Sequence, residues 1–314
     1  MSDVFGKVNS SCMLCPRECG VDRSVQVGRC HVGAEVVVAR ASLHMWEEPC
    51  ISGENGSGTV FFTGCPLSCV YCQNRRISGG DNGVVLSIDE LADVFLKLQD
   101  MGAHNINLVT PTHFVHQIVT ALENAKGGGL CVPIVYNTSG YESVPTLKYL
   151  DGLVDIYLPD CKYFSPNISA KYSSAPDYFS CTALALAEMY RQVGPPQFQS
   201  VGTEDEMPLM SRGMIVRHMI LPGYVEDSKS VLRYLYSTFG DNIYISIMNQ
   251  YTPLENVAGY PEINRRVTEV EYNTVVDYAV SLGIENAFVQ EGETATESFI
   301  PDFESFSLGK FMNL

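Results

Sequence analysis

The sequence predicts an α/β protein, a partial (β/α)6 barrel preceded by a cysteine-rich N-terminal extension. Short apolar runs rich in Val, Ile, Phe and Tyr recur along the chain without strict polar alternation, which is typical of parallel strands covered on both faces. Amphipathic segments separate these runs, and repeated strand–helix units imply right-handed crossovers. The first run leads directly into a cysteine-rich loop. Because barrel active sites lie at the carboxyl ends of strands, this loop favours a barrel over an open doubly wound sheet.

Six barrel strands and one short final strand are expected, at residues 59–64, 105–110, 132–138, 154–160, 214–221, 243–248 and 287–290. A capping box at Ser87–Glu90 predicts the start of the first helix. Apolar stripes and stop signals predict further helices at residues 115–122, 145–150, 183–193, 231–240 and 268–283. Six units suit a partial barrel, since a full eight-unit barrel usually needs about 250 residues.

Three zones organise the chain: a cysteine-rich N-terminal segment (1–57), the barrel (58–290) and a C-terminal tail (291–314). The first zone is expected to be irregular and to end in the Gly/Ser-rich linker 52–58. The tail carries Phe299, Phe303 and Phe306 and is also expected to be irregular. Residues 194–213 are interpreted as a disordered insertion, with a lid over the barrel mouth as the alternative.

Composition excludes several classes of protein. The chain has 314 residues and a net charge of −16, and it lacks a basic run, which argues against nucleic acid as a partner. The first residues show no signal sequence, and no stretch is long and apolar enough to span a membrane. A cytoplasmic location is therefore expected. In that compartment, eleven cysteines indicate metal or redox chemistry rather than a disulfide framework.

The loop after the first strand contains Cys65, Cys69 and Cys72 in a CxxxCxxC pattern. Three thiolates can hold three irons of a cubane cluster and leave the fourth iron open for reaction. Structural zinc normally needs four closed ligands, and disulfides need an oxidising compartment. The loop therefore predicts an iron–sulfur cluster with one open iron.

This loop, with a strand before it and Tyr71 just before its last cysteine, resembles that of the radical S-adenosylmethionine (SAM) superfamily. In that family the open iron of a [4Fe–4S] cluster binds SAM and reduces its sulfonium. The resemblance implies reductive cleavage of SAM to methionine and a 5′-deoxyadenosyl radical, which abstracts hydrogen from a substrate. It also implies an oxidoreductase working under anaerobic conditions.

Polar residues follow the other expected strands and could bind SAM. Hydroxyls and carbonyls suit its amino group, Lys or Arg its carboxylate, Asn or Asp its ribose, and an aromatic ring its adenine. The candidate cofactor-binding residues are Tyr71, Thr110, Thr112, Asn137, Ser139, Asp160, Lys162, Arg217 and Gln250. Each has a simpler alternative, because Ser, Thr and Asn often cap turns, and Lys162 and Arg217 could be paired surface charges. No catalytic acid or base is assigned.

More closely, the chain resembles an uncharacterised branch described as pyruvate formate-lyase activating enzyme-like. The shared motifs include Thr63-Gly-Cys65, Val109-Thr-Pro-Thr-His113, Tyr136-Asn-Thr-Ser-Gly140, Leu158-Pro-Asp-Cys-Lys162, Ile215-Val-Arg-His218 and Met248-Asn-Gln-Tyr251. The resemblance places Asn137 at the position of a ribose ligand, Lys162 near the SAM carboxylate, and Arg217 at the fifth-strand arginine. Two features of activating enzymes are missing: the Gly-Gly-Glu after strand two, which usually receives the SAM amino group, and the sixth-strand His.

A second thiolate-dense segment contains Cys12, Cys15, Cys19 and Cys30. Four thiolates could hold zinc or a second iron–sulfur cluster, and spacing does not decide between these metals. Reduced cysteines that pack as small apolar residues are the alternative. Cys50 is a possible extra ligand. The remaining cysteines, Cys131, Cys161 and Cys181, are expected to be core thiols.

The expected partners are an electron donor such as flavodoxin or ferredoxin and a substrate, with no nucleic acid and no membrane. The substrate is either a glycyl-radical-type partner protein or a smaller molecule or peptide. An iron–sulfur electron carrier or metal-binding scaffold without SAM turnover is the alternative function. That alternative accounts for the cysteines but leaves the polar strand ends unexplained.

Overall fold

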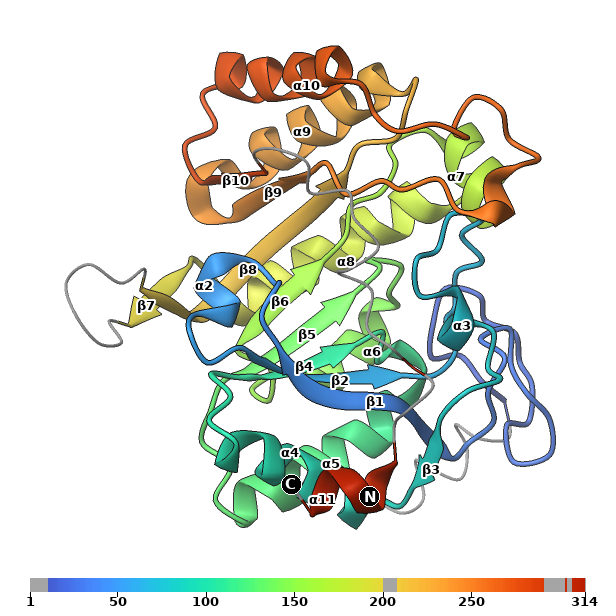
Figure 1. The fold of residues 1–314 in the computed structure, drawn as a ribbon, viewed down its shortest axis with the longest axis vertical. Coiled ribbons are helices and arrows are strands. Elements are labelled where there is room, and N and C mark those ends of the chain that lie inside the picture. Colours follow the sequence, from blue (N-terminus) through green and yellow to red (C-terminus); the bar gives the residue numbers. More distant parts are fainter. Residues whose placement is uncertain (1–10, 200–207, 291–302, 304–306, 314) are drawn as a thin grey trace.

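The computed structural model describes residues 11–199, 208–290, 303 and 307–313. Its centre is a curved sheet in which seven strands run parallel in the order β10-β9-β8-β6-β5-β4-β2 (Figure 1). Their bounds are β2 (Ser57–Phe62), β4 (Ile106–Val109), β5 (Ile134–Thr138), β6 (Ile156–Pro159), β8 (Leu209–Met219), β9 (Tyr244–Met248) and β10 (Ala287–Val289). The partial (β/α)6 barrel predicted from the alternating runs is the fold observed.

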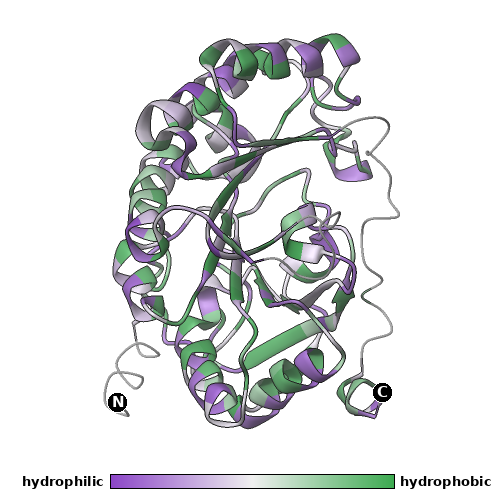
Figure 2. Ribbon diagram, turned by 90° about the vertical axis from the view of Figure 1, so that its left-hand side faces the viewer, coloured by the Kyte–Doolittle hydropathy of each residue, from purple (hydrophilic) through white to green (hydrophobic). Residues whose placement is uncertain are grey.

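Helices connect the strands and lie along the outer side of the curved sheet (Figure 2). The main ones are α4 (Ile88–Asp100), α5 (Val115–Gly127), α6 (Val144–Leu147), α8 (Tyr178–Val193), α9 (Val225–Phe239) and α10 (Glu269–Leu282). Short 3-10 turns occur at Thr112–Phe114, Lys148–Leu150, Gly240–Asn242 and Glu255–Val257. Capping boxes begin α4 and α10, with Ser87 and Thr268 as the N-caps, so local side-chain hydrogen bonds fix both starts.

The N-terminal zone is less irregular than expected. Residues Val36–His44 form β1, which pairs antiparallel with β2, and β3 (Val84–Leu86) pairs antiparallel with β1. The Val-rich start of β1 gains backbone partners and a buried face by joining the sheet edge. The short helix α2 (Pro49–Ser52) in this zone was not predicted, and neither were α3 (Arg75–Ser78) and α7 (Pro166–Ser173) further along the chain. The boundary expected after residue 57 falls inside β2.

The segment 194–213 contains β7 (Gln197–Gln199), which pairs antiparallel with the first residues of β8. Residues 200–207 lie outside the described part of the chain. The β7 pairing is at the amino end of β8, whereas the loops that follow the parallel strands lie at their carboxyl ends (Figure 1). The described part of this segment is therefore at the opposite end of the barrel from the cysteine loop.

The tail is also partly ordered. Phe303 is buried and meets the ring of Phe61 at 5.5 Å between centroids, and α11 (Leu308–Met312) places Phe311 in the main core. The expectation of an irregular tail is thus wrong for α11, because Phe311 gains a buried site there. Phe299 and Phe306 lie outside the described residues.

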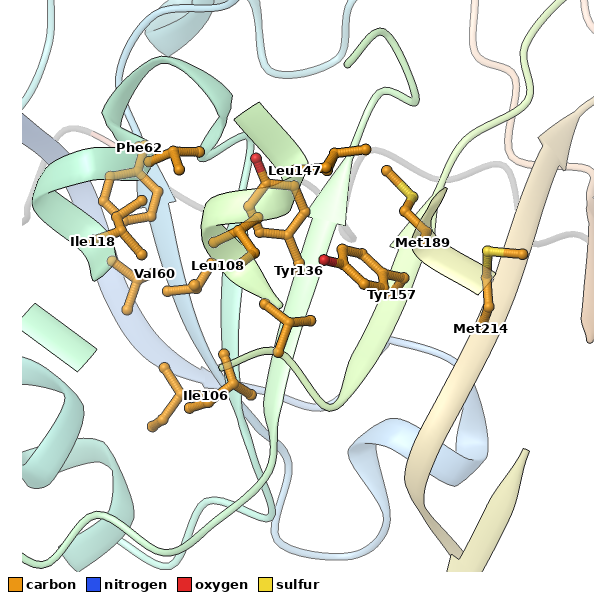
Figure 3. Close-up of a cluster of buried hydrophobic side chains, with 14 of the residues drawn as sticks. Val60, Phe62, Ile106, Leu108, Ile118, Tyr136, Leu147, Tyr157, Met189 and Met214 are labelled. Carbon is orange, nitrogen blue, oxygen red and sulfur yellow. The ribbon is translucent and has the colours of Figure 1, made fainter. Parts of the chain in front are cut away.

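Two packing layers support the barrel. Between sheet and helices, Val60, Leu108 and Tyr136 pack against helix residues such as Ile118 and Leu147 (Figure 3). On the inner face, a smaller cluster consists of Cys50, Ile51, Val135, Ile156, Leu158, Met210 and Ile215. Helix α2 thereby fills the barrel interior.

Among the described residues, no helix is long and apolar enough to cross a membrane.

Candidate functional site

A cavity of about 250 Å³ lies at the carboxyl ends of the parallel strands. It brings together all three cysteines of the loop and most of the predicted cofactor-binding residues: Cys65, Cys69, Tyr71, Cys72, Thr110, Asn137, Ser139, Asp160, Lys162, Arg217 and Gln250. Thr112 is not among the lining residues. It is buried, and its hydroxyl donates to Glu142 Oε1 at 2.5 Å. The parallel barrel therefore gathers side chains from six separate strand ends into one site.

The cysteine loop is held by segments outside the barrel. The Cys65 N–H donates to the Cys30 carbonyl at 3.2 Å, and the Val70 N–H donates to the Tyr172 carbonyl at 2.8 Å. Gly64 has φ +89°, and a Cβ there would lie 2.5 Å from the Cys30 oxygen, so only glycine permits this approach. Arg17 Nε also donates to the Pro66 carbonyl at 2.9 Å. The N-terminal zone and α7 thus fix the loop from two sides.

Hydrogen-bond donors face each of the three sulfurs. The Leu67 backbone hydrogen-bonds to the Cys65 sulfur, and the Ser173 hydroxyl lies 2.9 Å from the Cys69 sulfur. The Cys72 sulfur is hydrogen-bonded to the Ser78 hydroxyl and the Asn74 backbone. Burial raises the pKa of all three thiols, that of Cys69 to about 11, while the Lys162 ammonium lowers each of them. Because a thiolate accepts hydrogen bonds and is the form that binds metal, this surrounding fits cluster ligands.

No three Cys, His, Asp or Glu side chains in the described ranges converge so as to hold a single metal ion. That arrangement is what a zinc site requires, with four ligands around one ion. A cubane cluster differs because each cysteine binds a separate iron. The lack of a single-ion site among the described residues is therefore compatible with a cluster at the three loop cysteines.

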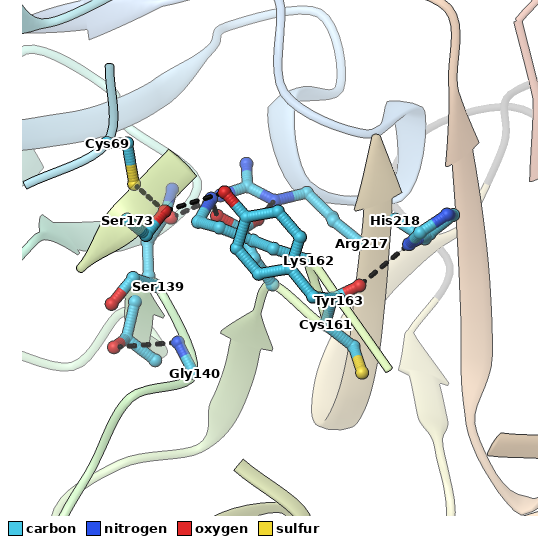
Figure 4. Close-up of polar contacts among 12 residues, drawn as sticks. Cys69, Ser139, Gly140, Cys161, Lys162, Tyr163, Ser173, Arg217 and His218 are labelled. Atoms are coloured by element: carbon cyan, nitrogen blue, oxygen red, sulfur yellow. Dashed lines mark hydrogen bonds and ion pairs between the residues drawn. The ribbon is translucent and has the colours of Figure 1, made fainter. Parts of the chain in front are cut away.

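A network of buried charges lines the cavity (Figure 4). Arg217 donates from Nε to Asp160 Oδ1 at 3.1 Å and from Nη2 to Asn137 Oδ1 at 2.6 Å. Lys162 Nζ donates to the other carboxylate oxygen of Asp160. The side chains of Lys162 and Arg217 are only 17% and 16% exposed, so they are paired inside the cavity and not on the surface.

The neighbouring charges in this network keep Asp160 and Arg217 ionised. Burial acts to raise the pKa of Asp160, but Lys162 and Arg217 outweigh it and hold that pKa below its usual value. Burial opposes the charge of Arg217, yet Asp160, Glu48 and Glu47 hold its pKa above the usual value. The cavity thus presents charges that are largely buried, and electrostatic interactions are stronger at buried sites than in water.

Sequence reasoning missed Glu47. This residue lies between β1 and α2 and lines the cavity, where Arg217 Nη1 donates to its Oε2 at 3.2 Å. Its Oε1 accepts from Asn107 at 3.1 Å and from Asn137 at 3.4 Å. Burial raises the pKa of Glu47. The available signal was the pair of acidic residues directly before the apolar helix that begins at Pro49, because buried carboxylates need partners.

The ends of β5 and β6 approach closely at Gly140. Its φ is +77°, and a Cβ there would lie 2.1 Å from the Asp160 carbonyl oxygen. The Tyr178 hydroxyl, from α8, donates to the carbonyls of Ser139 at 2.7 Å and Asp160 at 3.0 Å. Ser139 lines the cavity, and its buried hydroxyl makes no hydrogen bond within the described structure.

Tyr71, Thr110 and Gln250 are held by their neighbours. The Tyr71 ring meets Tyr251 at 5.8 Å, the Thr110 N–H donates to the Asn137 carbonyl at 2.8 Å, and Gln73 Nε2 donates to the Gln250 carbonyl at 3.0 Å. These contacts join the cysteine loop to the ends of β4, β5 and β9.

The histidines near the strand ends are structural. His113 Nε2 lies 2.7 Å from the Thr63 carbonyl, and burial lowers its pKa to about 3. His218 Nδ1 lies 2.7 Å from the Cys161 carbonyl, and burial lowers its pKa to about 4. Neither residue is among those that line the cavity.

The four N-terminal cysteines lie together in a compact loop. Cys12, Cys15 and Cys30 are buried and Cys19 is partly exposed. A Cβ on Gly28 would lie 3.3 Å from the Cys30 sulfur and 3.6 Å from the Cys19 sulfur, so these two sulfurs flank one glycine. No group of three that could hold a single metal ion is found among the described residues, and a second metal site at these cysteines stays a prediction.

The other cysteines differ from one another. Cys50 packs inside the barrel with Val135 and Leu158, so it is not an extra ligand of the N-terminal group. Cys161 is a core thiol as predicted, and Cys181 is partly exposed. Cys131 is exposed, so its prediction as a core thiol is wrong; the turn before β5 places it at the surface.

A parallel partial barrel with three cysteines after its first strand and a polar cavity at its carboxyl end defines a cluster-binding α/β domain. The family model of the radical SAM superfamily matches residues 59–194, and this part of the chain is a radical SAM domain. Members of the superfamily are enzymes, mostly of redox and radical chemistry, and the family implies a [4Fe–4S] cluster and SAM.

Individual relatives are distant. The uncharacterized protein MJ0674 of Methanocaldococcus jannaschii is 25% identical over 286 residues, which cover 88% of this chain and 76% of that protein. Among solved structures, Streptococcus suis SuiB bound to SAM has a TM-score of 0.48 at 12% identity, covering 78% of this chain and 52% of that one. The FeFe-hydrogenase maturase HydG from Carboxydothermus hydrogenoformans has a TM-score of 0.49 at 15% identity, covering 75% and 54%. The chain thus spans about half the length of these two solved structures.

Proposed function

We propose that this protein cleaves SAM reductively at a [4Fe–4S] cluster held by Cys65, Cys69 and Cys72, and that the resulting 5′-deoxyadenosyl radical abstracts hydrogen from a substrate. The observation that carries the proposal is that the three cysteines and the Lys162–Asp160–Arg217 network line one cavity in a radical SAM domain. An electron carrier or metal-binding scaffold would need the cysteines but not the buried charges, whose desolvation is costly without a ligand to recognise.

Different side chains of the cavity are suited to different groups of SAM. The Lys162 ammonium lines the same cavity as the loop cysteines and lowers their pKa values, and it supplies a cation for a carboxylate. The free Ser139 hydroxyl supplies a donor or acceptor for an amino or hydroxyl group. Asn137 and Asp160 supply acceptors suited to ribose, and Tyr71 a ring suited to adenine. These buried walls also exclude water from the radical.

The proposed substrate is a protein or peptide segment. Trp46 lines the cavity and is 62% exposed, and the adjoining Met45 is 44% exposed, which gives the mouth an apolar aromatic rim. Exposed tryptophan is enriched at the centres of protein interfaces. A glycyl-radical-type partner belongs to this substrate class. We further propose a cytoplasmic enzyme that receives its electron from a carrier such as flavodoxin or ferredoxin.

The test is formation of 5′-deoxyadenosine by anaerobically reconstituted, dithionite-reduced protein. Wild type and Cys131→Ala should form the product, because Cys131 is exposed and outside the cavity, whereas Cys69→Ala should form none. A full cubane spectrum without product in wild type would refute SAM cleavage. It would favour the electron-carrier alternative.

We also propose that Cys12, Cys15, Cys19 and Cys30 bind a second iron–sulfur cluster. The proposal is supported by the grouping of four cysteines in one compact loop, where the Cys19 and Cys30 sulfurs both lie beside Gly28. The test is the iron and zinc content of a variant in which Cys65, Cys69 and Cys72 are all replaced by Ala. This triple variant should still contain iron and acid-labile sulfide. Both should be lost when Cys15 is also replaced by Ala. Zinc, or no metal, would contradict this assignment.

A further inference from the structure

One of the three loop cysteines ends a chain of buried hydroxyl groups. The Ser173 hydroxyl lies 2.9 Å from the Cys69 sulfur, and the Tyr163 hydroxyl lies 2.6 Å from the Ser173 hydroxyl (Figure 4). The Tyr71 hydroxyl in turn contacts that of Tyr163. Ser173 and Tyr163 are fully buried, and Tyr71 is buried as well.

The donor in each of these hydrogen bonds can be assigned from the sulfur at which the series of hydroxyl groups ends. A cysteine thiolate bound to iron has no proton to give, so Ser173 must donate to Cys69. Its single proton is then used, and its oxygen accepts from Tyr163. The Tyr163 oxygen accepts in the same way from Tyr71. Every hydroxyl therefore donates toward the sulfur, and such a chain polarises each bond in the same sense.

The position of Ser173 is fixed by the backbone around it. Ser173 is the last residue of α7, and the helix ends because Ser174 adopts the left-handed conformation at φ 51°. Arg17 donates to the carbonyls of Ser173 at 3.2 Å and Ser174 at 2.6 Å. Together with the bond from the Val70 N–H to the Tyr172 carbonyl, this holds the end of α7 against the loop on both sides.

We propose that Ser173 is a positioning residue that raises the reduction potential of the loop cluster through its hydrogen bond to Cys69, with Tyr163 orienting the Ser173 hydroxyl. This inference rests on the proposed function, because it takes the cluster at Cys65, Cys69 and Cys72. A donor at a ligand sulfur withdraws electron density and stabilises the reduced cluster. Reduction adds one electron from the external carrier, and no bond forms or breaks in these residues.

The experiment is an anaerobic redox titration of the reconstituted cluster without SAM, followed by its optical and EPR signals. Ser173→Ala should shift the midpoint potential to a more negative value. Tyr163→Phe should shift it less in the same direction, because Ser173 remains but loses its orienting partner. Adding Tyr163→Phe to Ser173→Ala should give no further shift. A matched control is Ser169→Ala, in the same helix, since Ser169 is buried and its hydroxyl bonds to the Pro166 carbonyl at 3.1 Å.

Equal potentials for Ser173→Ala, Ser169→Ala and wild type, at equal iron content, would overturn the inference. That result would leave the proposed SAM cleavage untouched, because the cluster would still be present and reducible. If Ser173→Ala fails to take up a cluster, Tyr163→Phe and the control decide the question with the same readout. Absence of a cubane cluster in wild type would overturn the proposed function and this inference together.

Discussion

Replacement of Gly140 by Ala should destabilise the protein by about 2–5 kcal/mol. The left-handed backbone at φ +77° costs an alanine about 1–2 kcal/mol. The new Cβ would also stand 2.1 Å from the Asp160 carbonyl oxygen and 3.1 Å from Thr182 Cγ2. Since carbon and oxygen atoms settle more than 3 Å apart, the backbone must open by at least about 1 Å. Overpacking of this kind costs about 1–3 kcal/mol.

The same movement acts on the site. The Asp160 N–H donates to the Thr138 carbonyl at 2.8 Å, and the Asp160 carboxylate holds both Lys162 and Arg217. Displacing this strand end should therefore weaken SAM binding as well as stability. Gly152→Ala is the matched control, because Gly152 has φ +81° and an added Cβ would meet nothing within 4 Å. The control should lose only the about 1–2 kcal/mol of backbone strain.

The assay is urea unfolding of both variants and wild type under identical anaerobic conditions, with SAM binding measured by calorimetry on reconstituted protein. Gly140→Ala should lose more free energy of unfolding than Gly152→Ala, and it alone should lose SAM affinity. Equal losses in the two variants would show that the close approach to Asp160 is relieved at no cost. The account of the β5–β6 strand ends would then be wrong.

Three further changes have defined outcomes. Lys162→Met should reduce 5′-deoxyadenosine formation at least about tenfold by removing a buried cation, whereas exposed Lys126→Met should not. Burial raises the pKa of Glu142 to about 7, so the folded state retains a proton that the unfolded state loses. Stability should therefore fall by up to about 3 kcal/mol as pH rises from 4.5 to 7 in urea titrations, and Glu142→Gln should flatten this slope. Arg17→Ala, which frees the Pro66 carbonyl, should speed the loss of iron to a chelator; an unchanged rate would show that Arg17 does not hold the loop.

The barrel could be predicted because its strands carry a strong local signal. Runs such as Ile134–Thr138 are buried on both faces and begin with apolar residues. The capping boxes at Ser87 and Thr268 mark helix starts in four residues. β1 was missed because an antiparallel edge strand depends on its partner, and the cysteines around it suggested an irregular segment. α7 was missed because its short, Ser-rich sequence has a weak apolar face and is stabilised by contacts with the cysteine loop.

The site was predictable where it follows strand ends and not where it comes from elsewhere. Lys162, Asp160 and Arg217 follow or end parallel strands, so topology alone brings them to one edge. Glu47 lies between β1 and α2, and Ser173 lies at the end of α7, so neither residue directly follows a parallel strand. Nothing in the local sequence of either residue indicates which strand end it will contact. Thr112 follows a strand end as well, yet the 3-10 turn there directs it to Glu142.

Glu47 also bears on the missing Gly-Gly-Glu. In the activating enzymes that the chain resembles, the carboxylate after strand two receives the SAM amino group. Here Thr110 occupies that strand end, at φ 58°, and the buried carboxylate of the cavity comes instead from the connection between β1 and α2. Glu47 forms an ion pair with Arg217. Replacing Glu47 with Gln should therefore leave Asp160 as the main counter-charge of Arg217 and make the net charge of the cavity more positive. Because SAM is a cation, the affinity of Glu47→Gln for SAM should then fall. Unchanged affinity would show instead that Glu47 only holds Arg217 in place, because the amide of Gln retains a hydrogen-bond acceptor for Arg217.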